Sequence, residues 1–81
     1  MLNCAQFEAL ELLCLRAYPL KVVLRDQRKF LAIAVDIAAV EGVEKVCFKT
    51  ANALCWVEST KLAALEVLES SAPFTYLDLA A

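Results

Sequence analysis

The segment that most constrains the fold is VEKVCFKTANALCWVE, residues 43–58, because it has the pattern of a β-hairpin. Two runs rich in valine, phenylalanine and tryptophan flank the short stretch Thr-Ala-Asn, and such runs around a turn are typical of antiparallel strands. The hairpin also contains two of the four cysteines, Cys47 and Cys55, and the only tryptophan, Trp56. Its pairing therefore decides which of these three side chains are buried.

Two registers of this hairpin are open. If Ala51 and Asn52 form the centre of the turn, Cys47 lies opposite Trp56, and the two thiols point to opposite faces of the sheet. If the loop has three residues, Cys47 lies directly opposite Cys55. We favour the first register because it also pairs a lysine with a glutamate across the strands. It places Cys55 in the core and Cys47 on the outer face.

The apolar content limits how the rest of the chain can fold. Apolar residues make up 62% of the 81 residues, which is more than one small monomeric core can bury. Either both faces of a sheet are covered, or part of the apolar surface contacts a partner. We therefore predict a single domain over residues 1–81 with a protein partner, or a second copy of the chain as partner, and we expect a homodimer.

Charge and targeting features exclude several classes of protein. The net charge is −2 and the basic residues form no stripe, so we expect no nucleic-acid partner. The N-terminus lacks the positive region of a secretory signal. The apolar run at residues 30–40 is shorter than the ~20 residues that a membrane span needs. We expect no membrane contact and a cytoplasmic location, where cysteines are free thiols.

Periodicity predicts three helices and four strands. Asn3 and Gln6 have the spacing of a capping box for a first helix at residues 4–16. The remaining elements are a strand at 20–25, a helix at 27–42 that stops at Gly42, the hairpin, a helix at 61–71 and a strand at 74–79. With the N-terminal helix in 1–17 and the core in 18–81, this order predicts an α+β fold, a ferredoxin-like β-α-β-β-α-β domain with a four-stranded antiparallel sheet. The first helix either covers the open face of that sheet or packs at its edge.

Residues 20–79 resemble a heavy-metal-associated domain, the fold of small copper chaperones. The resemblance rests on the strand KVVL (21–24), the segment EGVEKVCF (41–48) and the spacing from the hairpin to the following helix. That family binds metal through M-x-C-x-x-C, and at the matching positions this chain has Leu24, Asp26 and Lys29, which lack the soft thiolates that select Cu(I). The resemblance implies the scaffold without its metal site, as in relatives that act as protein-interaction modules.

Catalytic and metal-binding chemistry has few candidates. The chain has no histidine and no Cys-x-x-Cys pair, which argues against general acid–base catalysis and a structural zinc. Cys4 and Cys14 lie ten residues apart on the first helix, roughly 15 Å along its axis, and cannot pair. Asp26 with Arg25, Arg28 and Lys29 could bind an anion at a helix N-terminus, but we favour a cap with solvated charges around it. We expect no catalytic residue, no metal, no cofactor and no enzyme activity.

The outer face of the predicted sheet is the best candidate for a partner surface. Its apolar and aromatic members are Val23, Leu54, Trp56, Phe74 and Tyr76. RNA-recognition motifs bind bases on a similar face, but their aromatic-rich signature is absent here. We therefore predict a small non-enzymatic protein-interaction or assembly module that is homo-oligomeric through this face or the first helix. The alternatives are a thiol-based metal or redox carrier with relocated cysteines and a small-ligand or regulatory domain of the ferredoxin-like type.

Overall fold

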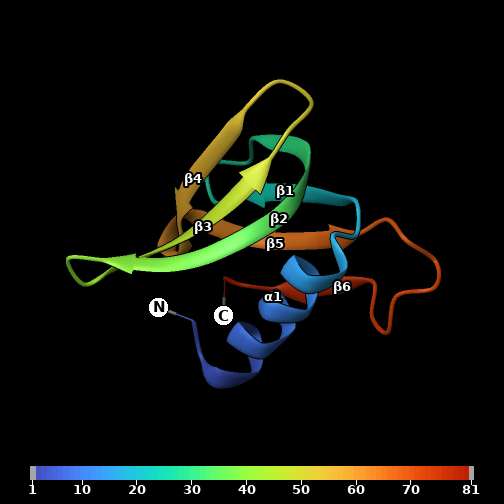
Figure 1. Ribbon diagram of the computed structural model, residues 1–81, viewed down its shortest axis with the longest axis horizontal. Helices are drawn as coiled ribbons and strands as arrows, with labels where there is room; N and C mark the ends of the chain where they lie inside the picture. Colours follow the sequence, from blue (N-terminus) through green and yellow to red (C-terminus); the bar gives the residue numbers. More distant parts are fainter. Residues whose placement is uncertain (1, 81) are drawn as a thin grey trace.

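One helix is followed by six strands in the computed structural model, which describes residues 2–80 (Figure 1). The elements are α1 (Cys4–Arg16), β1 (Leu20–Leu24), β2 (Lys29–Val40), β3 (Val43–Lys49), β4 (Leu54–Glu58), the short 3₁₀ helix η1 (Ser59–Lys61), β5 (Leu62–Val67) and β6 (Tyr76–Asp78). The strands form one antiparallel sheet in the order β4-β3-β2-β1-β5-β6. The predicted ferredoxin-like fold, with its four-stranded sheet and two core helices, is therefore wrong.

The first helix is confirmed at its predicted bounds, residues 4–16. Its capping box is formed, because the Asn3 side chain accepts from the Gln6 backbone N–H at 2.8 Å and the Gln6 side chain accepts from the Asn3 N–H at 2.9 Å. The helix ends where Ala17 adopts a left-handed φ of 53° and donates to the Leu13 carbonyl. Leu10 and Leu13 are fully buried, so apolar packing against β2 and β6 holds α1 beneath the sheet (Figure 1).

The helix predicted at residues 27–42 is instead the long strand β2. Ala32 and Ala34, two residues apart, are buried, whereas Leu31, which precedes Ala32, is 65% exposed. This alternation of buried and exposed positions is typical of a strand. Almost every residue of this segment is apolar, so it matches a helical and a strand period equally well. Pairing with the neighbouring strands decides between them, because β1 and β3 flank β2 and satisfy its backbone hydrogen bonds.

The helix predicted at residues 61–71 is also wrong, and β5 occupies most of that segment. Leu62 and Leu65 are fully buried, and β5 pairs with β1 so that Leu20 lies opposite Val67. Leucine, alanine and glutamate favour a helix in isolation, but the two neighbouring strands override this weak local preference. Without these two helices the resemblance to a heavy-metal-associated domain has no structural basis.

β2 bends the sheet. Its first residues pair with β1 and its later residues pair with β3, and the register shifts between Ala34 and Asp36. At its end Glu41 and Gly42 have φ values of 52° and 79° and form the two-residue turn into β3. Gly42, predicted to stop a helix, therefore closes a hairpin.

The favoured register of the β3–β4 hairpin is confirmed. Cys47 lies opposite Trp56, and Phe48 lies opposite Cys55. The turn is held by Thr50, whose hydroxyl oxygen accepts hydrogen bonds from two backbone N–H groups of the turn at 3.3 and 3.1 Å. The two thiols therefore do not face each other across the hairpin.

The burial of these two cysteines is the reverse of the prediction. Cys47 is only 2% exposed, whereas Cys55 is exposed. Cys55 lies on β4, an edge strand with a neighbour on one side only, whereas β3 lies inside the sheet. Burial, and then the negative charge of Asp36, raise the pKa of the Cys47 thiol above its ordinary value of 9.0, and the same two causes raise the pKa of Cys14 on α1.

The core lies between the bent sheet and α1. Its fully buried members are the larger apolar side chains of α1, β1, β3 and β5: Leu10, Leu13, Leu20, Val22, Val46, Phe48, Leu62 and Leu65. The ring of Phe30 packs edge-on against Phe48, with 5.9 Å between the ring centroids. Within residues 2–80, no helix is both long and apolar enough to cross a membrane.

Candidate interaction surfaces

The five predicted partner-binding residues do not form one strip of the sheet. Leu54 and Trp56, 63% and 49% exposed, lie on β4 at one edge, and Tyr76, 56% exposed, lies on β6 at the other. Val23 is half-buried on β1 between these edges, and Phe74 packs against the core. Four strands separate β4 from β6. The residues on these two strands are therefore not neighbours, as they would have been in the predicted ferredoxin-like sheet. A role of these residues in partner binding remains a prediction.

A hollow of about 780 Å³ lies between the β1–β2 turn, β4 and η1. We call it the cationic hollow, because its lining includes five basic and two aromatic side chains: Arg25, Arg28, Lys29, Lys45, Lys61, Phe30 and Trp56. Its wall is held by the backbone. The N–H of Arg25 donates to the carbonyl of Lys61, and the N–H of Leu24 donates to the carbonyl of Arg28, each at 2.9 Å. These bonds fix the β1–β2 turn beside η1.

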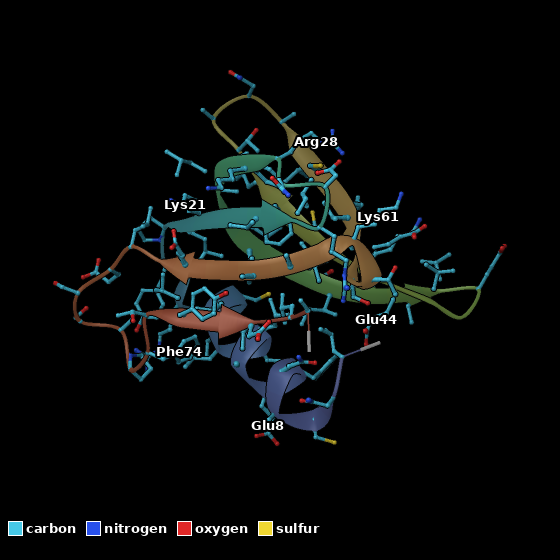
Figure 2. All side chains as sticks on the ribbon, turned by 180° about the vertical axis from the view of Figure 1, so that it is seen from behind. Glu8, Lys21, Arg28, Glu44, Lys61 and Phe74 are labelled. Carbon is cyan, nitrogen blue, oxygen red and sulfur yellow. The ribbon has the colours of Figure 1, made fainter. Side chains whose placement is uncertain are left out.

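The charges of the chain are segregated around this hollow. Five basic residues line it against two acidic ones, Asp26 and Glu58, whereas the rest of the chain carries three basic against eight acidic residues. Figure 2 shows Arg28 and Lys61 on the part of the molecule away from Glu8 of α1. This acidic protein therefore has a locally positive concavity.

Few of the cations in the hollow are neutralised. Arg28 binds Asp26 at 2.7 Å, and hydrogen bonds from the Arg28 backbone and side chain lower the pKa of the Asp26 carboxyl. Within residues 2–80, no carboxylate forms an ion pair with Lys29, Lys45 or Lys61. Lys29 and Lys61 are exposed, whereas Lys45 is half-buried with Glu58 as its cross-strand neighbour but forms no salt bridge with it.

A second depression, about 350 Å³ in volume, lies between α1 and β2. We call it the α1–β2 groove, and its lining residues are Phe7, Glu11, Cys14, Leu15, Val35, Asp36 and Ile37. Leu15 is 79% exposed, and Phe7 and Val35 are each 37% exposed. Neither Glu11 nor Asp36 forms an ion pair within the described part of the chain. The Asp36 carboxylate accepts a hydrogen bond from the Ile37 backbone N–H at 2.8 Å. The groove thus combines exposed apolar side chains with two carboxylates that have no ion-pair partner within residues 2–80.

Neither surface follows from the sequence-based prediction, because both depend on β2 being a strand. The turn after β1 brings the cluster RDQRK next to β4 and η1, which a helix over residues 27–42 would not do. Asp36 lies at the bend of β2 beside α1, a position that exists only in the strand. The sequence signal for the cationic hollow is the basic cluster RDQRK, which the sequence alone led us to interpret as a cap with solvated charges rather than as an anion site.

Comparison with known proteins identifies the family. A family model described as ROF, modulator of Rho-dependent transcription termination, matches residues 1–79. The chain belongs to the ROF family. The match includes α1, all six strands and both surfaces described above.

The fold of this ROF protein is similar to a solved structure described as YaeO bound to magnesium, from Vibrio cholerae O395. The two chains are 20% identical and superpose with a TM-score of 0.78, over 86% of this chain and 92% of the other. No protein of curated function gives a significant match. Within residues 2–80 no group of three or more cysteine, aspartate or glutamate side chains could hold a metal ion.

These comparisons correct the predicted identity and role. The ROF assignment overturns the heavy-metal-associated resemblance, the ferredoxin-like assembly module and its alternative, the thiol-based metal or redox carrier. Nothing in them supports the predicted homo-oligomer. The broader expectation of a protein partner is confirmed, because the family acts on a process that depends on the protein Rho.

Proposed function

We propose that this ROF protein is a non-enzymatic regulator that binds Rho and changes the yield of Rho-dependent transcription termination. The observation that carries the proposal is the family match over residues 1–79. It also supports a place of action in the cytoplasm beside the transcription machinery, as the sequence predicted. The second copy of the chain that was predicted as an alternative partner is not needed for this role.

The α1–β2 groove is the surface that we assign to Rho. Exposed apolar side chains that gather in a depression are typical of protein–protein contacts, and Leu15 and Phe7 lie at the groove on a rigid helix. The negative charges of Glu11 and Asp36, which have no ion-pair partner within residues 2–80, favour a partner surface in which an apolar side chain is flanked by lysine or arginine. The groove is firmly built, since Leu10 and Leu13 anchor α1 in the core.

Binding and termination are measured together to test this function. Purified protein is titrated into Rho by calorimetry, and the fraction of terminated transcripts is measured on a Rho-dependent template. We expect saturable binding and a dose-dependent change in that fraction. No binding at concentrations of tens of micromolar, together with an unchanged terminated fraction, would refute the proposal.

Matched variants test the assigned surface. Leu15→Ala should weaken Rho binding about three- to tenfold, because it removes an exposed contact without opening a cavity. Leu68→Ala, at a position 54% exposed outside the groove, is its control. Glu11→Lys should weaken binding most at low salt, and Glu8→Lys, the same change on the same helix outside the groove lining, is its control. Equal effects of each variant and its control would place the Rho contact elsewhere.

A further inference from the structure

We infer that the cationic hollow binds a nucleoside phosphate, either as a free nucleotide or as a unit of an RNA strand. This site is distinct from the α1–β2 groove, with which it shares no lining residue. It goes beyond the proposed function and departs from the sequence-based expectation that the chain has no nucleic-acid ligand.

The charge of the hollow selects an anion. Lys29, Lys45 and Lys61 lie on three different elements, and within residues 2–80 none of them forms a salt bridge, although Glu58 lies opposite Lys45. Uncompensated like charges around one concavity repel one another, and a phosphate among them replaces that repulsion with attraction. Arg28 is already paired with Asp26, and the Arg25 guanidinium donates to the carbonyls of Leu79 and Ala80 at 3.5 and 3.4 Å. The three lysines are therefore the cations of the hollow with no side-chain contact of this kind within the described residues.

The aromatic groups of the hollow select a ring beside the phosphate. Trp56 is 49% exposed on the edge strand β4, so one part of its indole is open to a ligand. Stacking of a base on an aromatic side chain is the usual partner of phosphate contacts in single-stranded nucleic-acid sites. The volume of about 780 Å³ lies in the range of small-molecule sites and suits one nucleotide.

The rest of the surface argues for a short ligand. Outside the hollow the chain carries three basic and eight acidic residues, which repel a long polyanion that leaves the site. One to a few nucleotides can therefore occupy the hollow, and extended binding along the protein is disfavoured.

Trp56 provides the assay, because it is the only tryptophan of the chain and lines the hollow. Its fluorescence is followed while the purified full chain is titrated at low salt with inorganic phosphate, with adenosine and uridine monophosphates, and with a four-nucleotide RNA. We expect the nucleotides to change the emission saturably and to bind more tightly than inorganic phosphate. Tighter binding of the four-nucleotide RNA than of the monophosphates identifies RNA as the source of the ligand, and the reverse identifies a free nucleotide.

Charge-reversal variants locate the site. Lys61→Glu should weaken nucleotide binding at least about fivefold, since it replaces an attractive contact with a repulsive one. Lys49→Glu, the same change at an exposed position of β3 outside the hollow, should alter the affinity less than about twofold. Circular dichroism confirms that both variants are folded, and amide chemical shifts of residues 24–30 and 55–61 provide a second readout.

Three results would overturn the inference: no saturable response to any of these ligands, equal effects of the two charge reversals, or binding of inorganic phosphate as tight as that of the nucleotides. If Lys61→Glu weakens Rho binding while no nucleotide binds, the hollow contacts an acidic part of Rho instead, and the inference is also refuted. The titration contains no Rho, so its failure leaves the proposed function unchanged.

Discussion

Gln6 connects α1 to the far edge of the sheet, and its replacement tests how the helix is held. The side chain is 8% exposed. Its Oε1 accepts from the Asn3 N–H at 2.9 Å, and its Nε2 donates to the Asp78 carbonyl of β6 at 3.0 Å. One amide group therefore closes the capping box and bridges two elements that are 72 residues apart in sequence.

We expect Gln6→Ala to lower the free energy of unfolding by about 2 kcal/mol. Loss of half of a capping box contributes roughly 0.5–1 kcal/mol. Loss of the hydrogen bond to the partly buried Asp78 carbonyl contributes about 1–2 kcal/mol, because that oxygen then lacks its side-chain donor. For a domain of this size, the sum corresponds to a decrease in Tm of about 8–16 °C.

Urea unfolding followed by far-ultraviolet circular dichroism measures this change, and two further variants separate its parts. Asn3→Ala removes the cap bond to the Gln6 N–H and should cost about 1 kcal/mol. Gln6→Glu retains an acceptor for the cap but loses the donor to Asp78. The reasoning fails if Gln6→Ala lies within about 0.5 kcal/mol of the unaltered protein. If Gln6→Glu is fully stable, the bridge to β6 contributes nothing.

Two other predictions concern the backbone and the thiols. Gly42→Ala should lower stability by about 1 kcal/mol in the same urea assay, because a φ of 79° strains an alanine even though its Cβ would meet no atom within 4 Å; an unchanged midpoint would contradict this. With a thiol reagent near pH 8, exposed Cys4 and Cys55 should react first, Cys14 more slowly, and Cys47 only in urea. Because burial raises the folded-state pKa of Cys14 and Cys47, their contribution to stability is complete below about pH 9 and is lost as the pH rises through the raised values. An increase in the free energy of unfolding above about pH 9 would contradict the raised pKa values of these two thiols.

Local interactions made part of the fold predictable. Asn3 and Gln6 lie three residues apart, and the bonds between them start α1 without help from the rest of the chain. The β3–β4 hairpin is similar, since Thr50 and its neighbours close the turn through bonds within four residues, and the turn sets the register. In both cases the decisive partners are close in sequence.

The segments that were mispredicted are held by pairing with other strands rather than by side-chain caps within the segment. Residues 30–40 and 62–67 are apolar on nearly every position, so their own pattern does not distinguish a helix from a strand. β1 pairs with both of them, through contacts such as Leu20 with Ala32 and Leu20 with Val67. The pairing of β1 with β5 joins segments far apart in the chain, which a single sequence does not record. β2 is joined to β1 and β3 by short turns, but its apolar pattern does not show that these turns form.

The candidate surfaces follow the same division. Composition already determined that apolar groups would remain at the surface. The segment RDQRK already determined that basic residues would cluster. Only the bend of β2 decided that Asp36 lies beside α1, and only the sheet order placed Trp56 on an edge strand next to the β1–β2 turn. The capping box and the β3–β4 turn depend on neighbours in the chain and were readable from the sequence. Concave surfaces are assembled from segments far apart in the chain, so the tertiary structure alone decided where they form.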